Sequence, residues 1–218
     1  MKLGIFGGTF NPIHYGHLRA AEEAREEVGL DKILFIPAGC PPIKTEDIAD
    51  ASHRAEMVRL ALSDNPHFEI SDIECRQAGK SYSLNTLEEL KTMHPDDEFF
   101  FILGIDAFLD LPNWWMPEIL ITVTNFIIIS RPGFRFADLK ASPYLSADEP
   151  SLADLDGSRA ETYRANLKGG KGVILLNLTH IGISSTEIRR RRKQARSIKY
   201  LLPPEVLSYI IMNDLYRG

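Results

Sequence analysis

The sequence predicts an α/β domain built on a parallel sheet. Short apolar runs, each ending at glycine or proline, alternate with segments whose apolar residues recur at helical spacing. Among the runs are KLGIFGG from Lys2, KILFIP from Lys32 and EFFFILG from Glu98. The last run is apolar without a break, which is typical of a central strand buried on both faces. We therefore expect a doubly wound, Rossmann-like fold with helices on both faces of the sheet.

The beginning of the chain predicts a strand, a tight loop and a helix. An apolar run ends at Gly7 and Gly8, and from about Gly16 apolar residues recur on one helical face. Glycine lets the backbone approach a ligand closely, and the N–H groups at the start of the helix favour an anion. His14 and His17, at the helix entry, can both face one phosphate. We predict a phosphate site in 7–17, although neither GxxxxGK[ST] nor GxGxxG is present.

The rest of the chain continues the α/β pattern up to one irregular segment. Further strands are expected at 32–37, 68–71, 98–104, 125–130 and 172–178, and helices at 52–62, from about Ser81, from about Ser184 and at 203–216. Between 135 and 171 no period lasts. We interpret 135–171 as an insertion or lid before the last strand, with no chemistry assigned, inside a single domain that spans 1–218.

Composition narrows the class of ligand and the compartment. A chain of 218 residues with 44% hydrophobic residues can bury a sizeable core. The net charge of −5 gives no basic field for nucleic acid, so we expect nucleotides rather than polymers as ligands. Cys40 and Cys75 are too few for a disulfide framework, and no signal peptide or long apolar span is present. These features favour a cytoplasmic protein without a membrane partner.

Polar residues follow the carboxyl ends of the predicted strands, where doubly wound sheets bind ligands. Gly104 and Asp106 follow the central strand, and Asp106 is placed either for ribose hydroxyls or for a helix cap. Lys44 follows the second strand on a proline-rich loop, where it is a mobile charge or an ordinary surface lysine. Of Trp114 and Trp115, one is expected either to stack on a heterocycle or to pack in the core.

A second anion site is predicted near the end of the chain, in THIGISSTEIRRRRKQ. Ser184, Ser185 and Thr186 are hydroxyl caps and Glu187 follows in the first turn, so a helix is expected to begin here and to present an N-terminal anion site. Arg189 lies one turn further on, on the face shared with Ser185 and Thr186. We interpret 190–193 as an ordinary basic surface.

Two motifs resemble those of a known group. GGTFNPIHYGH resembles the (H/T)xGH signature of the nucleotidyltransferase superfamily, and in particular of its bacterial nicotinate mononucleotide adenylyltransferases. ISSTEIR matches the superfamily's second signature, ISSTxIR, in every specified position. The resemblance covers the chain outside 135–171. It departs at Asn11, where the family usually carries Asp, and at Ile43, where it usually carries His before the matching Lys44.

The resemblance implies adenylyl transfer from ATP to nicotinate mononucleotide, which gives deamido-NAD and pyrophosphate in NAD biosynthesis. It implies catalytic roles for His14, His17, Lys44 and Arg189. The expected ATP-binding residues are Gly7, Gly8, Thr9, Phe10, His17, Gly104, Asp106, Ser184, Ser185, Thr186 and Arg189. The expected mononucleotide-binding residues are Asn11, Lys44, Thr86, Trp114 and Arg131; Thr86 stands in SYSLNTL, which resembles the family's SYTxDTL.

Other interpretations stay open from the sequence. No carboxylate cluster suggests a metal site in the protein, so Mg²⁺ is expected to arrive with ATP. The acceptor can instead be nicotinamide mononucleotide or phosphopantetheine. A nucleotide-binding regulator without turnover is a third interpretation, motivated by Asn11, Ile43 and the insertion. The oligomeric state is not predicted.

Overall fold

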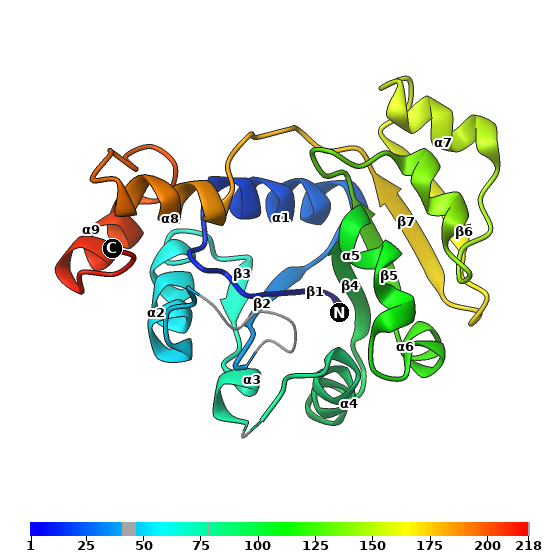
Figure 1. Cartoon of the computed structure of the whole chain (residues 1–218). Helices are drawn as coiled ribbons and strands as arrows, with labels where there is room; N and C mark the ends of the chain where they lie inside the picture. Colours follow the sequence, from blue (N-terminus) through cyan, green and yellow to red (C-terminus); the bar gives the residue numbers. More distant parts are fainter. Residues whose placement is uncertain (41–46, 78, 218) are drawn as a thin grey trace.

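The computed structural model describes residues 1–40, 47–77 and 79–217 (Figure 1). A seven-stranded sheet has the order β3-β2-β1-β4-β5-β7-β6. Its neighbouring strands are parallel except for β6 and β7, which pair antiparallel. The predicted Rossmann-like α/β fold is therefore confirmed, with an antiparallel edge strand added. The strands are β1 Lys2–Gly8, β2 Lys32–Pro37, β3 Phe68–Ile70, β4 Glu98–Gly104, β5 Asn125–Ile129, β6 Thr162–Asn166 and β7 Gly172–Leu176.

Helices cover both faces of the sheet, as Figure 1 shows for α1 and α8 on one side and α4 on the other. None of the described helices is both long enough and apolar enough to span a membrane. The α-helices are α1 Tyr15–Val28, α2 Ala51–Ala61, α3 Ile73–Arg76, α4 Ser83–Met93, α5 Ile105–Leu109, α6 Pro117–Val123, α7 Glu149–Asp156, α8 Ser185–Lys193 and α9 Pro204–Met212, and the 3₁₀ helices are η1 Leu111–Asn113 and η2 Phe136–Ala141.

The core consists of two apolar clusters, one on each face of the sheet. Side chains alternate between the faces along a strand, so Phe99 and Phe101 of β4 enter one cluster and Phe100 and Ile102 enter the other. Each cluster continues into the helices on its side. Burial of both faces explains why the sequence of β4 reads as an unbroken apolar run.

The order of the strands places the ligand site. From β1 the chain builds β2 and β3 on one side, and from β4 it builds β5 and β7 on the other. β1 and β4 are neighbours, so their carboxyl ends at Gly8 and Gly104 adjoin at the point where the strand order reverses. Open α/β sheets bind ligands at this point.

The segment 135–171 is more ordered than its sequence predicts. It forms η2, α7 and β6, and its buried side chains join the core cluster that holds Phe99: Phe136, Leu139, Tyr144, Leu145, Leu152, Leu155 and Leu167. Its elements are short, with eight residues in α7 and five in β6, so no hydrophobic period is long enough to be recognised. The segment extends the sheet, and its role as an insertion or lid stays a prediction.

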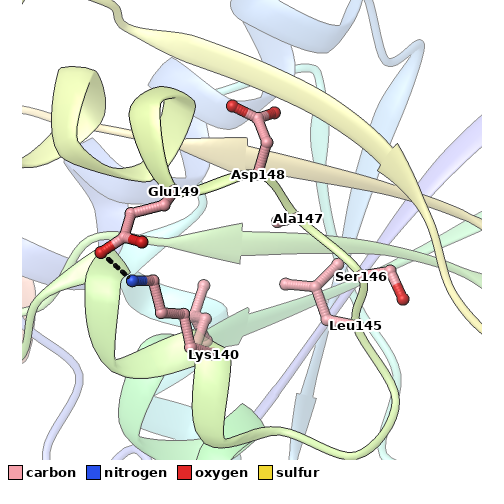
Figure 2. Close-up of a pocket in the computed structure, with 7 residues that line it drawn as sticks. Lys140, Leu145, Ser146, Ala147, Asp148 and Glu149 are labelled. Atoms are coloured by element: carbon pink, nitrogen blue, oxygen red, sulfur yellow. Dashed lines mark ion pairs between the residues drawn. The ribbon is translucent and has the colours of Figure 1, made fainter.

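A pocket of about 600 Å³ lies within this segment (Figure 2). Its charged side chains have partners already: Lys140 forms an ion pair with Glu149, and Asp148 accepts hydrogen bonds from the Ser151 N–H at 2.9 Å and the Tyr163 hydroxyl at 2.7 Å. No predicted site residue lines it. Its walls are formed by Leu139, Lys140, Leu145, Ser146, Ala147, Asp148 and Glu149.

Candidate active site

The two histidines of the first motif lie together at the entry to α1. His14 is the N-cap residue of α1 and His17 lies in its first turn. Their rings stack with centroids 3.8 Å apart and planes 23° apart. A Cβ at Gly16 would lie 3.1 Å from the His14 ring, so glycine is what allows this close approach. The structure thus brings together the two imidazoles that the spacing predicted on one face.

His14 is neutral at physiological pH. Only 5% of the residue is exposed, and burial lowers its pKa from 6.5 to about 4, with a further contribution from the charge of Arg131. A neutral imidazole donates one hydrogen bond and accepts another. His14 is therefore suited to donate to a phosphate oxygen without carrying a buried charge of its own.

The low pKa of His14 predicts a loss of stability in mild acid. Because the folded pKa lies below the unfolded value, the unfolded chain binds the extra proton, and stability is lost as the pH falls from about 6.5 to 4. At pH 4.5 the expected loss is about 2 to 3 kcal/mol. Urea unfolding at pH 7 and pH 4.5 should show a smaller loss for His14→Gln than for the parent. Equal losses would remove His14 as the cause.

Phe10 and Arg54 support the loop between β1 and α1. The buried Phe10 ring packs edge-on against His17, with centroids 5.2 Å apart, so the side chain of this predicted ATP-binding residue lies in the core. The Arg54 guanidinium donates to the carbonyls of Thr9 at 2.9 Å, Gly39 at 2.8 Å and Ala49 at 2.8 Å. Burial lowers its pKa. The positive charge of Arg54 itself thereby lies at the predicted phosphate loop.

Sequence reasoning missed Arg54, although a signal was present. Arg54 is three and four residues before Met57 and Val58, which form the apolar stripe of α2. It therefore lies on the buried face of this helix, where a charged residue is rare unless its polar atoms are bonded.

The Asn11 side chain bonds to the protein itself. Its amide nitrogen donates to the Asp47 carbonyl at 2.8 Å, and its oxygen accepts from the Ala49 N–H at 3.1 Å and the Tyr216 hydroxyl at 2.8 Å. Its predicted contact with the mononucleotide stays a prediction. A carboxylate could accept the last two bonds but could not donate the first, so Asn satisfies all three bonds and Asp would not.

The second motif contacts the first directly. Ser184 caps α8, as predicted, by accepting from the Glu187 N–H at 3.2 Å. Ser185 donates to the Pro12 carbonyl at 2.8 Å, and Arg189 donates to the Asn11 carbonyl at 2.9 Å. Ser184 and Thr186 are exposed. The starts of α1 and α8 thus adjoin the same loop, α1 with two stacked imidazoles and α8 with exposed hydroxyls and the Arg189 guanidinium.

Asp106 and Arg131 complete this edge of the sheet. They follow β4 and β5, and Asp106 Oδ2 lies 3.1 Å from Arg131 Nε. A Cβ at Gly104 would lie 2.4 Å from Asp106 Oδ1, so glycine is required for the carboxylate to lie there. Because the charge of Arg131 also lowers the pKa of His14, this pair lies near the histidines.

The predicted mononucleotide contacts at Thr86 and Trp114 are largely enclosed. Thr86 is 2% exposed and its hydroxyl donates at 2.8 Å to Glu74, a buried carboxyl whose pKa is raised by burial. Trp114 packs on the Phe101 ring and donates to Asp110. The exposed ring of the tryptophan pair is instead that of Trp115, which the sequence could not distinguish from Trp114.

Trp115, which follows η1 in the chain, lies in space beside the start of α4. Its ring centroid is 5.5 Å from that of Tyr82, the N-cap residue of α4. The side chain of Tyr82 makes no capping hydrogen bond, and the first turn of α4 holds no acidic residue. Two aromatic rings therefore adjoin a helix N-terminus. Lys44 lies outside the described residues.

One family and several full-length relatives with the same name match this chain. The cytidylyltransferase-like family matches residues 5–191. The chain is 44% identical to the probable nicotinate-nucleotide adenylyltransferase of Geotalea daltonii, over 100% of this chain and 99% of the relative. It is 44% identical to the protein of the same name from Geobacter metallireducens, over 99% of this chain and 98% of the relative.

Solved structures support the fold. The chain resembles Plasmodium falciparum nicotinic acid mononucleotide adenylyltransferase complexed with NaAD, with a TM-score of 0.73 and 24% identity, over 99% of this chain and 97% of that one. A putative nicotinate-nucleotide adenylyltransferase from Vibrio parahaemolyticus gives a TM-score of 0.65 and 18% identity, over 100% and 97%. Given the full-length relatives at 44% identity, this chain belongs to the nicotinate-nucleotide adenylyltransferase family.

Proposed function

We infer that this chain transfers the adenylyl group of ATP to nicotinate mononucleotide, which gives deamido-NAD and pyrophosphate. Its full-length relatives carry this activity in their name. The structural observation that carries the inference is the junction of the two motifs, where Ser185 and Arg189 bond to the carbonyls of Pro12 and Asn11. This junction gathers donors for a polyphosphate from both ends of the chain.

The reaction is a direct displacement. An oxygen of the mononucleotide's 5′-phosphate forms a bond to the α-phosphorus of ATP, while the bond from that phosphorus to the bridging oxygen breaks and pyrophosphate leaves with its electron pair. No covalent enzyme intermediate is needed. The protein has to align two polyanions and stabilise the charge that moves onto pyrophosphate.

The site residues divide by the phosphate that each one meets. We assign His14 and His17 to the α-phosphate and the incoming phosphate, a role that Lys44 is also predicted to share. Ser184, Thr186 and Arg189 hold the β- and γ-phosphates. The exposure of Ser184 and Thr186 at the start of α8 supports this assignment, because a helix N-terminus favours anions.

Asp106 accepts hydrogen bonds from ribose hydroxyls in this proposal, while Arg131 faces phosphate. Their ion pair keeps both side chains at the edge where β4 and β5 end. The proximity of Arg131 to His14 supports its phosphate role.

The pyridine end of the mononucleotide is assigned to the start of α4. Trp115 replaces Trp114 as the ring that stacks on the pyridine, because Trp115 is exposed and adjoins Tyr82. The N–H groups of the first turn of α4 are suited to bind the nicotinate carboxylate, since the N-cap residue Tyr82 makes no side-chain hydrogen bond to them. Thr86 supports this turn through its bond to Glu74 rather than by donating to the substrate.

Mg²⁺ enters the reaction with the substrate. Imidazoles, hydroxyls and guanidinium groups fit phosphate oxygens and do not form a magnesium cage, so the ion is assigned to the triphosphate oxygens and water. We place the reaction in the cytoplasm, which agrees with the free thiols of Cys40 and Cys75.

The test is pyrophosphate release from ATP with three acceptors in parallel: nicotinate mononucleotide, nicotinamide mononucleotide and phosphopantetheine. Mass spectrometry identifies each product. We expect deamido-NAD with the first acceptor as the main product. Turnover mainly with phosphopantetheine would identify a different acceptor class, and ATP binding without turnover on any acceptor would favour the regulator.

A further inference from the structure

Lys193 shares a carboxylate with Arg189. The two cations lie one turn apart on α8, and both bind Asp47: Lys193 Nζ lies 2.7 Å from Asp47 Oδ1, and Arg189 Nε lies 3.3 Å from Asp47 Oδ2. Each oxygen of one carboxylate therefore faces a different cation. Sequence reasoning treated Lys193 as an ordinary surface residue.

The cations between them on α8 have other partners. Arg190 and Arg191 both bind Glu187, at 2.7 Å and 2.8 Å, and Arg192 binds Asp214 at 3.3 Å. The pairs of Arg190 and Arg191 are typical of a solvated helix surface, whereas the Arg192 side chain is only 16% exposed. Lys193 differs from them because its partner is also the partner of Arg189, whose Nη1 donates to the Asn11 carbonyl in the phosphate loop.

The Asp47 carboxylate is accessible to solvent and can release the two cations that it binds. Its side chain is 40% exposed and that of Lys193 is 43% exposed. The hydrogen bond from Lys193, and next to it that from Arg189, lowers the pKa of Asp47, so the carboxylate is charged. The main-chain carbonyl of Asp47 stays bonded to Asn11, so rotation of the side chain alone would release both cations.

We propose that Lys193 is a further phosphate-binding residue, which binds the terminal phosphates of ATP and the leaving pyrophosphate together with Arg189 once the ligand displaces the Asp47 carboxylate. This rests on the proposed function for its setting. The charges favour the exchange, because a polyphosphate brings several negative charges to two cations that share a single carboxylate. Asp47 thus competes with the ligand and lowers its apparent affinity.

The test measures binding of inorganic pyrophosphate to the full chain by calorimetry. Lys193→Ala should weaken binding about tenfold, as expected for the loss of one charge-assisted bond. Lys193→Arg should restore most of the affinity, because the charge returns. Asp47→Asn should strengthen binding several-fold. The matched control Arg190→Ala, on the same helix, should change affinity less than twofold.

Steady-state kinetics separates a binding role from a structural one. Lys193→Ala should raise the KM for ATP about tenfold and leave kcat within about threefold, because a residue that holds the terminal phosphates before and during transfer acts mainly on binding. Circular dichroism confirms that each variant is folded.

Two results would overturn the proposal. If Lys193→Ala binds pyrophosphate no more weakly than Arg190→Ala does, Lys193 is an ordinary surface residue without a role in phosphate binding. Asp47→Asn weaker than the parent would show that Asp47 holds the cations in place and does not compete. A parent protein that binds pyrophosphate but releases none from ATP would contradict only the proposed function. The comparison of pyrophosphate binding between Lys193→Ala and Arg190→Ala would still test the role of Lys193.

Discussion

His17→Ala should lower kcat by about a hundred- to a thousandfold at saturating ATP. Loss of one preorganised donor to a group that gains charge in the transition state typically costs about 3 to 4 kcal/mol. The structure supplies the preorganisation: the His17 ring stacks on His14 at 3.8 Å and meets the edge of Phe10 at 5.2 Å. These contacts fix the orientation of the imidazole before the substrate binds.

Initial rates of pyrophosphate release at saturating ATP and mononucleotide measure this effect. His67→Ala is a matched control, since His67 is exposed just before β3 and, among the described residues, its ring bonds to the Asp31 carbonyl at 3.3 Å, outside both motifs. It should change kcat less than twofold. A loss of less than about tenfold in His17→Ala would mean that His17 does not stabilise the transition state.

Arg189→Ala should lower kcat/KM by more than a hundredfold, and Arg189→Lys should recover little of it. Each charge-assisted bond to the leaving pyrophosphate is worth about 1.5 to 3 kcal/mol, and the planar guanidinium makes more than one. Arg189 already uses two of its nitrogens, with Nη1 on the Asn11 carbonyl and Nε facing Asp47. A lysine has a single nitrogen and cannot hold the loop and a phosphate together.

Arg190→Ala is the control for surface charge on α8, because Arg190 is exposed and pairs with Glu187. It should retain nearly full activity. Comparable activity in Arg189→Lys and the parent would show that Arg189 contributes only charge, and the pyrophosphate role would be lost.

Much of the fold was predictable because its signals are local. β2 and β4 have the predicted bounds, 32–37 and 98–104, since each is an apolar run between breaks in the pattern. The start of α8 followed from the Ser184 cap. α7 and β6 were missed because they are short and are stabilised by packing on the sheet, which no local pattern records.

The candidate site was predictable where a motif fixes the backbone. Spacing alone placed His14 beside His17. The sequence did not reveal the protein partners of two predicted mononucleotide contacts: Asn11 bonds to Tyr216, and Thr86 bonds to Glu74. Their contacts with the mononucleotide stay predictions.

Other residues were missed because their partners are distant in the chain. Arg54 bonds to Thr9, Asp47 pairs with α8, and the hydroxyl of Tyr216 reaches the phosphate loop. The helical period of α2 marks Arg54 as buried, but no local pattern identifies the distant partner of any of these side chains.

The acceptor in the proposed reaction is nicotinate mononucleotide, and its amide counterpart should be a poor substrate. The acid and the amide are nearly isosteric, so the site has to discriminate by hydrogen bonding. A carboxylate only accepts, whereas the amide would turn N–H groups toward the uncapped N–H groups of α4. An unsatisfied buried donor costs about 1 to 3 kcal/mol, and the lost charge-assisted bond adds to this cost.

The most direct test is therefore kcat/KM for nicotinate mononucleotide and for nicotinamide mononucleotide in one assay, at fixed ATP and Mg²⁺. We predict a preference for the acid of about a hundredfold or more. Equal values, or a preference for the amide, would contradict the assignment of the acceptor.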